Sequence, residues 1–180
     1  MFKILYFGTY VPVQGTQYIV RAAKILEHEQ VQFLFAGNGQ EKEKTVALAK
    51  SLGLENTIFH DMLNSEDLKR EIISVDIILG NFGDTPLAPL VISNKVYEAL
   101  AMQKPVITSD MPANRELFDE DDVVMIPVAN PTALANAIVK LKNDHALCER
   151  IAKNGHEKFL KTATPAVLGR ELKTIIQKLL

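Results

Sequence analysis

The sequence predicts a single α/β domain with a doubly wound parallel sheet, and three observations support this. Short apolar runs rich in β-branched and aromatic residues recur along the 180 residues, with helical segments between them. The runs are continuously apolar, as is typical of strands that helices cover on both faces. The length and the 47% of apolar residues are enough to build one substantial core.

Strands and helices alternate up to about residue 143, which is the order expected of this fold class. The predicted strands are Ile4–Gly8, Val31–Gly37, Thr57–His60, Asp76–Leu79, Pro105–Thr108 and Val123–Val128. Apolar residues at the helical spacing i, i+3, i+4, i+7 occur twice, at Ile19, Ala22, Ala23 and Leu26 and at Leu134, Ala137, Ile138 and Leu141. Asn130 and Pro131 indicate a helix start, with Asn as N-cap and Pro at the first helical position.

Two further helices are predicted to end the chain, over His145–Thr162 and Pro165–Leu180. They are separated at Thr164 because Pro165 cannot continue a helix. We therefore expect residues 1–180 to form one domain, with 145–180 as terminal helices added to it.

Composition excludes several classes of function. The net charge of −2 offers no basic face for a nucleic acid. The single cysteine, Cys148, excludes an internal disulfide and permits a reducing compartment. No apolar run approaches the roughly 18 residues of a transmembrane segment, and the N-terminus is too short for a signal peptide, so we expect a cytoplasmic protein. The chain begins almost directly on a strand, which suggests that it was cut from a longer protein.

No metal site is expected, because the four histidines have no metal-ligand spacing with one another or with Cys148. No pair of a nucleophile and a base is readable either, and the catalytic residues stay unknown.

In a doubly wound sheet, ligands bind outside the carboxyl ends of the strands, near the point where the strand order reverses. The first loop there is Gly8–Gly15, whose glycines let backbone N–H groups approach a phosphate. It lacks the glycine fingerprint of a dinucleotide site or a P-loop, so a purely structural turn is the alternative. Gly37 and Asn38 form a second tight turn. The longer loop after the fourth strand holds Asp84 and Thr85, which could meet a polar ligand or only solvent.

A helix start follows that loop. Ser93 or Asn94 is a suitable N-cap, so the first free N–H groups of this helix would face the binding edge. Lys95 lies in the first turn, where the helix dipole disfavours a cation unless an anion is near. Glu98 follows one turn later on the same face. From these residues alone, Lys95 and Glu98 are either an exposed ion pair, contributing roughly 0.2–0.5 kcal/mol, or part of a phosphate site.

Taken in order, several segments resemble the C-terminal, nucleotide-sugar-binding domain of retaining enzymes of the glycosyl transferases group 1 family, which have two Rossmann-like domains. The segments are FGTYVPVQGTQYIVRAAKIL, FLFAGNGQEKEKTVALAKSLGL, IFHDMLNSEDLKREIISVDIIL, SNKVYEALAMQKPVITSDMPANREL and PVANPTALANAIVKL. The resemblance covers nearly the whole chain and depends on the order and spacing of all the segments.

This resemblance implies a nucleotide diphosphate sugar, such as a UDP- or GDP-hexose, as donor, with no metal or other cofactor. Glu98 would hold the ribose hydroxyls, and the helix start with Lys95 would face the diphosphate opposite the Gly8–Gly15 turn. The base would lie near His60–Leu63, and Asp84 and Thr85 could lie near the donor sugar. The nucleotide-binding residues implied are Gly8, Thr9, Gln14, Gly15, Gly37, Asn38, His60, Asp61, Met62, Ser93, Asn94, Lys95 and Glu98.

The sequence departs from the family pattern at three positions. Thr9 and Gln14 stand where many members have an Arg and a Lys on the diphosphate, and Leu90 replaces the first glutamate of an E-x7-E pattern. The contact that this glutamate makes with the donor sugar would be made instead by the loop of Asp84 and Thr85, or would be lost.

The family also places the acceptor site on an N-terminal domain, which this chain has no room for. That domain would be part of a longer chain or a partner subunit, and could associate with a membrane; the helix at Pro165–Leu180 would pack toward it. The main hypothesis is thus the donor-binding domain of a glycosyltransferase. The alternatives are a non-catalytic interaction module, favoured by Thr9, Gln14 and Leu90, and a dinucleotide-dependent oxidoreductase, for which the glycine fingerprint is missing.

Overall fold

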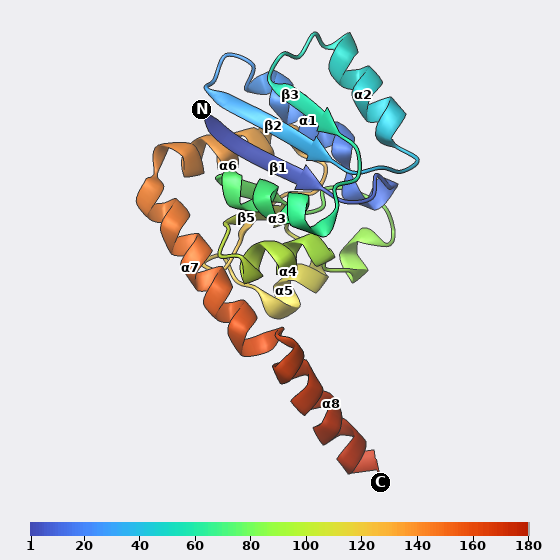
Figure 1. The fold of residues 1–180 in the computed structure, drawn as a ribbon, viewed down its shortest axis with the longest axis vertical. Coiled ribbons are helices and arrows are strands. Elements are labelled where there is room, and N and C mark those ends of the chain that lie inside the picture. Colours follow the sequence, from blue (N-terminus) through green and yellow to red (C-terminus); the bar gives the residue numbers. More distant parts are fainter. Residues whose placement is uncertain (180) are drawn as a thin grey trace.

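The computed structural model describes residues 1–179, which contain a six-stranded, all-parallel sheet in the order β3-β2-β1-β4-β5-β6 (Figure 1). The predicted doubly wound fold is confirmed. The strands are β1 (Phe2–Phe7), β2 (Val31–Ala36), β3 (Thr57–His60), β4 (Ile77–Leu79), β5 (Val106–Ser109) and β6 (Val124–Ile126).

Every predicted strand is present, and the differences are confined to strand ends. β1 begins at Phe2 rather than Ile4, because Phe2 pairs with Val31 at the start of β2. β6 ends at Ile126 instead of Val128, since Pro127 has no N–H with which to continue the ladder.

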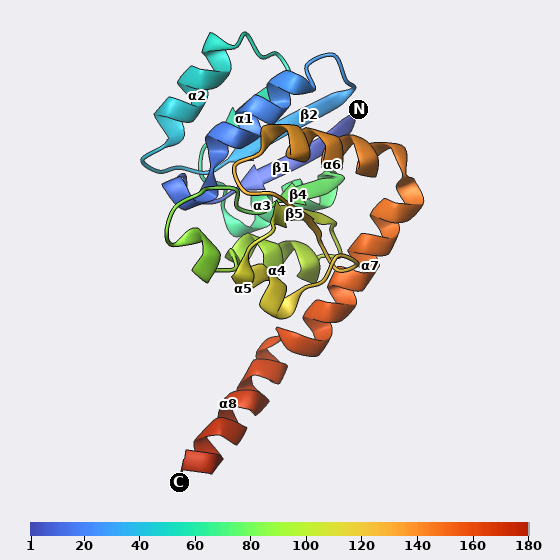
Figure 2. The same cartoon turned by 180° about the vertical axis from the view of Figure 1, so that it is seen from behind.

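Helices cover both faces of the sheet. They are α1 (Thr16–Ile25), α2 (Lys42–Ser51), α3 (Ser65–Ser74), α4 (Asn94–Ala101), α5 (Pro112–Leu117) and α6 (Pro131–Asn143), with short 3-10 turns at Pro12–Gln14 and Ala88–Leu90. Figures 1 and 2 show α1 and α6 on one face and α3 and α4 on the other. A hydrophobic core lies on each face of the sheet, and alternate residues of β1 point into one or the other. Ile4 and Tyr6 pack with α1 and α6, whereas Leu5 and Phe7 pack with α3 and α4. This double coverage explains the continuously apolar strands.

Two helices follow the sheet, and they differ in their packing. α7 (His145–Thr162) runs from α6 to α4, where the His156 ring lies 2.8 Å from the Leu100 carbonyl. α8 (Pro165–Leu179) has no buried residue and projects away from the domain in both views (Figures 1 and 2). Its exposed apolar residues are Leu168, Leu172, Ile175, Ile176 and Leu179. The last residue of the predicted helix, Leu180, lies outside the described residues. No helix within residues 1–179 combines the length and apolar character needed to cross a bilayer.

The topology determines where the loops lie. The chain winds outward from β1 through β2 to β3 and then returns to place β4 on the other side of β1. The loops that leave β1 and β4 therefore diverge, and they open a crevice at the carboxyl edge of the sheet, as the sequence rule predicts.

Candidate functional site

A cavity of about 470 Å³ occupies this crevice. It is formed by the ends of β1 and β2, the loops after β1, β3 and β4, and the first turns of α3 and α4. Its lining residues are Phe7, Gly8, Thr9, Val13, Gln14, Ala36, Met62, Leu63, Leu68, Asn81, Val91, Ile92, Ser93, Asn94, Lys95 and Glu98.

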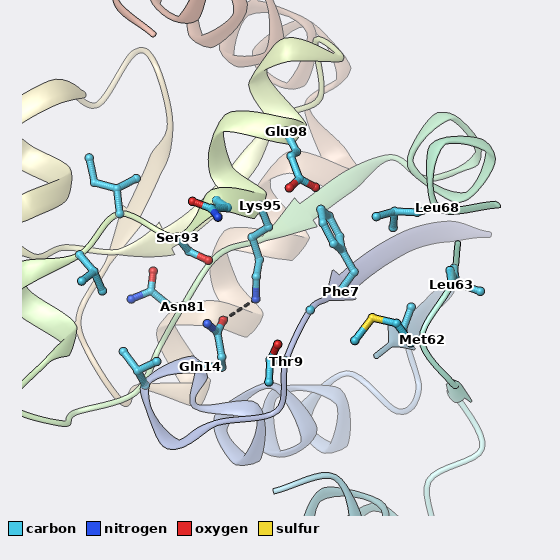
Figure 3. A pocket seen from close by; sticks show the side chains of 16 residues that line it. Phe7, Thr9, Gln14, Met62, Leu63, Leu68, Asn81, Ser93, Lys95 and Glu98 are labelled. Atoms are coloured by element: carbon cyan, nitrogen blue, oxygen red, sulfur yellow. Dashed lines mark hydrogen bonds between the residues drawn. The ribbon is translucent and has the colours of Figure 1, made fainter. Parts of the chain in front are cut away.

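The labelled side chains of the cavity divide into an apolar group and a polar group (Figure 3). Phe7, Leu63, Leu68 and Met62 gather on one side of the close-up. The polar side chains gather on the other, namely Gln14, Asn81, Ser93 and Lys95, and the Glu98 carboxylate lies between the two groups. Such a division suits a ligand with a flat apolar part, hydroxyl groups in the middle and an anionic end.

Lys95 dominates the electrostatics of the polar side. The side chain is only 4% exposed although it lies in the first turn of α4. Its Nζ donates to Gln14 Oε1 and lies 4.0 Å from the centroid of the Tyr6 ring. Burial lowers the pKa of the ammonium well below its ordinary value, and the charge of Glu98 opposes this only in part.

The alternative of an exposed ion pair between Lys95 and Glu98 is wrong. Within residues 1–179, no carboxylate oxygen lies within 4.0 Å of the Lys95 ammonium. The residues lie one turn apart on α4 and both line the cavity, but Lys95 is buried whereas Glu98 is exposed. A buried cation without a counter-charge is costly, so this cavity favours an anion.

The N-terminus of α4 adds to this preference. Ser93 is the N-cap, with an extended backbone, and its side chain makes no capping hydrogen bond. Both Ser93 and Asn94 line the cavity. The first N–H groups of a helix have no intrahelical partner and carry the positive end of the helix dipole, so they can bind an anion.

Glu98 lines the cavity one turn further along α4 and is exposed to it. Its carboxylate presents two acceptor oxygens toward the junction between the apolar and polar sides. A carboxylate in this position can accept hydrogen bonds from two vicinal hydroxyls.

The glycine turns bring the strand ends together. The Gly8 N–H donates to the Ala36 carbonyl at 2.9 Å. Gly37 has φ +142°, and a Cβ added there would lie 1.9 Å from the Gly8 carbonyl oxygen. Gly37 thus contributes through close backbone packing beneath the cavity rather than by lining it.

The structure brings part of the predicted site together. Of the predicted residues, Gly8, Thr9, Gln14, Met62, Ser93, Asn94, Lys95 and Glu98 line the cavity. Those that lie outside the lining are Gly15, Gly37, Asn38, His60, Asp61, Asp84 and Thr85.

Two of the outlying acidic and polar residues, Asp61 and Asp84, are engaged elsewhere or face solvent. Asp61 is paired with Lys42 at 2.6 Å, which holds the pKa of its carboxyl below the ordinary value. Asp84 is exposed, whereas the Thr85 hydroxyl is buried without a hydrogen-bond partner. Leu90 is 74% exposed and also lies outside the lining.

The predicted site residues did not include eight residues that line the cavity, namely Phe7, Val13, Ala36, Leu63, Leu68, Asn81, Val91 and Ile92. Phe7 and Leu68 form the apolar side, and Asn81, 1% exposed, forms part of the polar side. Asn81 follows β4 by two residues, so the rule that ligands bind at strand ends could have found it. Phe7 and Leu68 carried no signal, because apolar residues in a strand and a helix are expected in the core.

The sequence of this chain is similar to those of known glycosyltransferases. The family described as Glycosyl transferases group 1 matches residues 2–158. The lipopolysaccharide core biosynthesis glycosyltransferase LpsD of Rhizobium meliloti is 27% identical over 157 residues, which are 87% of this chain and 43% of that protein. The chain spans between 39% and 43% of the length of the curated relatives that it matches.

Two solved structures show the same fold. Anabaena Alr3699/HepE in complex with UDP-glucose superposes with a TM-score of 0.86 at 18% identity, over 98% of this chain and 49% of that one. The C-terminal domain of the glycosyl transferase group 1 family protein LpcC from Francisella tularensis gives a TM-score of 0.74 at 18% identity, over 91% of this chain and 87% of that domain.

Proposed function

Because the chain belongs to the Glycosyl transferases group 1 family, we propose that it is the donor-binding domain of a glycosyltransferase and that its cavity takes a nucleotide diphosphate sugar. The observation that carries this proposal is the Lys95 ammonium, which is 4% exposed and has no acidic partner among the described residues. A diphosphate supplies the missing counter-charge.

The proposed binding mode uses the division of the cavity. The diphosphate lies against Lys95 and the N-terminus of α4, opposite the turn that holds Gly8 and Thr9. The ribose hydroxyls donate to Glu98, and the base lies on the apolar side beside Phe7 and Met62.

This binding mode assists glycosyl transfer without a metal. When the bond between the sugar and the diphosphate breaks, negative charge grows on the departing nucleoside diphosphate. Lys95 and the N–H groups at the start of α4 are already oriented toward that position, so they stabilise the charge without rearrangement. Retention of configuration is part of the proposal, on the strength of the family resemblance.

Uridine is the base that we propose. Its support is the match to Anabaena Alr3699/HepE, which was solved with UDP-glucose. A GDP-sugar remains the second candidate, to be decided by the experiment below.

We further propose that the acceptor site lies on a separate domain or subunit. The chain spans about two fifths of the length of its curated relatives and resembles the C-terminal domain of LpcC over most of both chains. The unpartnered apolar side chains of α8 are the surface that we propose for contact with the missing part.

The test is thermal denaturation of the chain with UDP, GDP, ADP and NAD at millimolar concentration. A ligand that binds only the native state stabilises it by about 2.7 kcal/mol at 100 times its Kd, so we expect UDP to raise Tm. Glu98→Ala weakens UDP binding by roughly 1.5–3 kcal/mol, the range for hydrogen bonds to a charged group. Glu116→Ala is the matched control, because Glu116 is exposed and outside the cavity.

The second candidate function is the interaction module with a degenerate cleft. It is favoured by the neutral residues Thr9 and Gln14 and by Leu90, which lies outside the cavity. If no nucleoside diphosphate changes the Tm of the chain, the result would support the interaction module and overturn the proposal that the cavity binds a donor. A rise in Tm with NAD alone would instead support the oxidoreductase.

A further inference from the structure

Gln14 does not offer a free side chain to the cavity. Its carboxamide oxygen accepts a hydrogen bond from the Lys95 ammonium, which the close-up shows as the dashed line between α4 and the turn after β1 (Figure 3). The two residues are 81 positions apart in the sequence. The family resemblance implies direct contact between residue 14 and the diphosphate, but here the acceptor atom of Gln14 is already engaged by the only cation that lines the cavity within residues 1–179.

The backbone of Gln14 is anchored. Its N–H donates to the Val11 carbonyl at 2.9 Å, and its carbonyl accepts from the Phe82 N–H at 3.1 Å. The Gly83 N–H donates to the neighbouring Val13 carbonyl, also at 3.1 Å. The turn that carries Gln14 is thus tied to the segment after β4, which sets the carboxamide at a defined distance from α4.

The groups around the ammonium attract it without neutralising it. Tyr6 on β1 presents its ring face at 4.0 Å, Gln14 presents a neutral oxygen, and Glu98, one turn along α4, is the nearest acid that acts on its charge. Burial raises the pKa of the Tyr6 hydroxyl, which also keeps that neighbour neutral. Burial lowers the pKa of Lys95, and an anionic ligand would supply the counter-charge that these neighbours do not.

We propose that Gln14 is a positioning residue for the donor: its side-chain oxygen holds the Lys95 ammonium beside the Gly8 turn in the empty cavity, and the diphosphate takes over this hydrogen bond when it binds. The inference rests on the proposed function. An ammonium held in place loses little conformational freedom on binding, so less of the binding free energy is spent on ordering it. A neutral acceptor is also displaced by a diphosphate more readily than a carboxylate is.

Two substitutions separate positioning from a structural role, because they move the titration of Lys95 in opposite directions. Gln14→Glu adds a negative charge beside the ammonium and raises its pKa, whereas Gln14→Met removes the acceptor and lowers it. UDP affinity depends on the charged ammonium, so it falls as the pH rises through this pKa. The pH at which affinity falls should therefore move up in Gln14→Glu and down in Gln14→Met.

The experiment is calorimetric titration of UDP into the 180-residue chain from about pH 6 to about pH 10, a range that spans the ordinary pKa values of histidine and lysine. Comparison with the unsubstituted chain cancels the titration of UDP itself. We also expect Gln14→Glu to weaken UDP binding at neutral pH by about tenfold or more, since the carboxylate competes with the diphosphate. Gln17→Met is the matched control, because Gln17 lies on α1 outside the cavity and should leave both affinity and pH profile unchanged.

The outcomes are distinct. Opposite shifts of the pH profile support the proposal, and thermal denaturation without ligand verifies that each variant is folded. If UDP binds the unsubstituted chain but both variants keep its pH profile, Gln14 does not position Lys95 and the inference is overturned. If UDP fails to bind the unsubstituted chain at any pH, the proposed function itself fails.

Discussion

Lys95 is the residue on which the site depends, and its burial has a cost. A charged ammonium with the exposure of a core residue loses its hydration, and a hydrogen bond to Gln14 and the Tyr6 ring replace only part of it. A residue that costs stability in the empty protein is the expected signature of a binding group.

This argument predicts that Lys95→Met binds UDP at least about tenfold more weakly but unfolds at higher urea concentration than the unsubstituted chain at neutral pH. Each unit by which folding lowers the pKa corresponds to about 1.4 kcal/mol. Lys50→Met is the control, since Lys50 is exposed. A Lys95→Met chain that keeps its UDP affinity would show that the ammonium does not contact the diphosphate.

The same pKa shift predicts a pH dependence. The native pKa of Lys95 lies below the unfolded value of about 10.4, so between the two the unfolded state binds more protons and stability rises with pH. The destabilisation caused by burying the charged ammonium is complete below the native pKa of Lys95 and disappears toward about pH 10.4. The stability advantage of Lys95→Met should therefore shrink as pH rises, which urea denaturation at several pH values will measure. An advantage that is constant across pH would exclude desolvation of the ammonium as its cause.

At the scale of elements, α8 contrasts with every other helix. It carries apolar residues at positions 168, 172, 175, 176 and 179, the spacing of an amphipathic helix, yet none of its residues is buried. α7, in contrast, buries Ile151, Ala152 and Gly155 against the domain. The apolar stripe of α8 therefore contributes little to the stability of this domain.

We predict that a chain truncated after Ala163 has the same free energy of unfolding as the 180-residue chain to within about 0.5 kcal/mol, the usual range for changes away from the core. It should also bind UDP with unchanged affinity, because α8 contributes no residue to the cavity. Urea denaturation and calorimetry measure both quantities. A loss of several kcal/mol would show that α8 packs on the domain in solution.

At the scale of the whole molecule, the cavity is equipped for a nucleoside diphosphate more fully than for a sugar. Among residues 1–179, Glu98 is the only carboxylate that lines it, and Leu90, Asp84 and Thr85 lie outside. Sugar hydroxyls are usually bound by carboxylates and amides. The amides that line the cavity are Gln14, whose oxygen holds Lys95, the buried Asn81, and Asn94 at the start of α4.

We therefore predict that the chain binds UDP and a range of UDP-sugars with affinities within about threefold of one another, a difference of less than about 0.7 kcal/mol. Competition calorimetry against UDP will measure the series, with uridine as the control that lacks the diphosphate. A preference of more than tenfold for one UDP-sugar would mean that this domain recognises the sugar itself.

Much of the site was readable from the sequence because it lies at strand ends and a helix start, which are local features. The helix start at Ser93 and the common face of Lys95 and Glu98 follow from spacing along one segment. The positions of His60 and Asp61 relative to the cavity did not follow, because they depend on side-chain pairing such as that between Asp61 and Lys42.

The sequence by itself determined the doubly wound sheet, since continuously apolar strands alternating with amphipathic helices pack stably only as covered parallel layers. Only the tertiary structure decided what Lys95 is. Spacing permitted an exposed ion pair with Glu98, whereas folding buries the ammonium against Tyr6 and Gln14, residues from the far end of the sequence. The physical reason is that burial and pairing of a charge depend on contacts between distant segments, and a local pattern does not contain these.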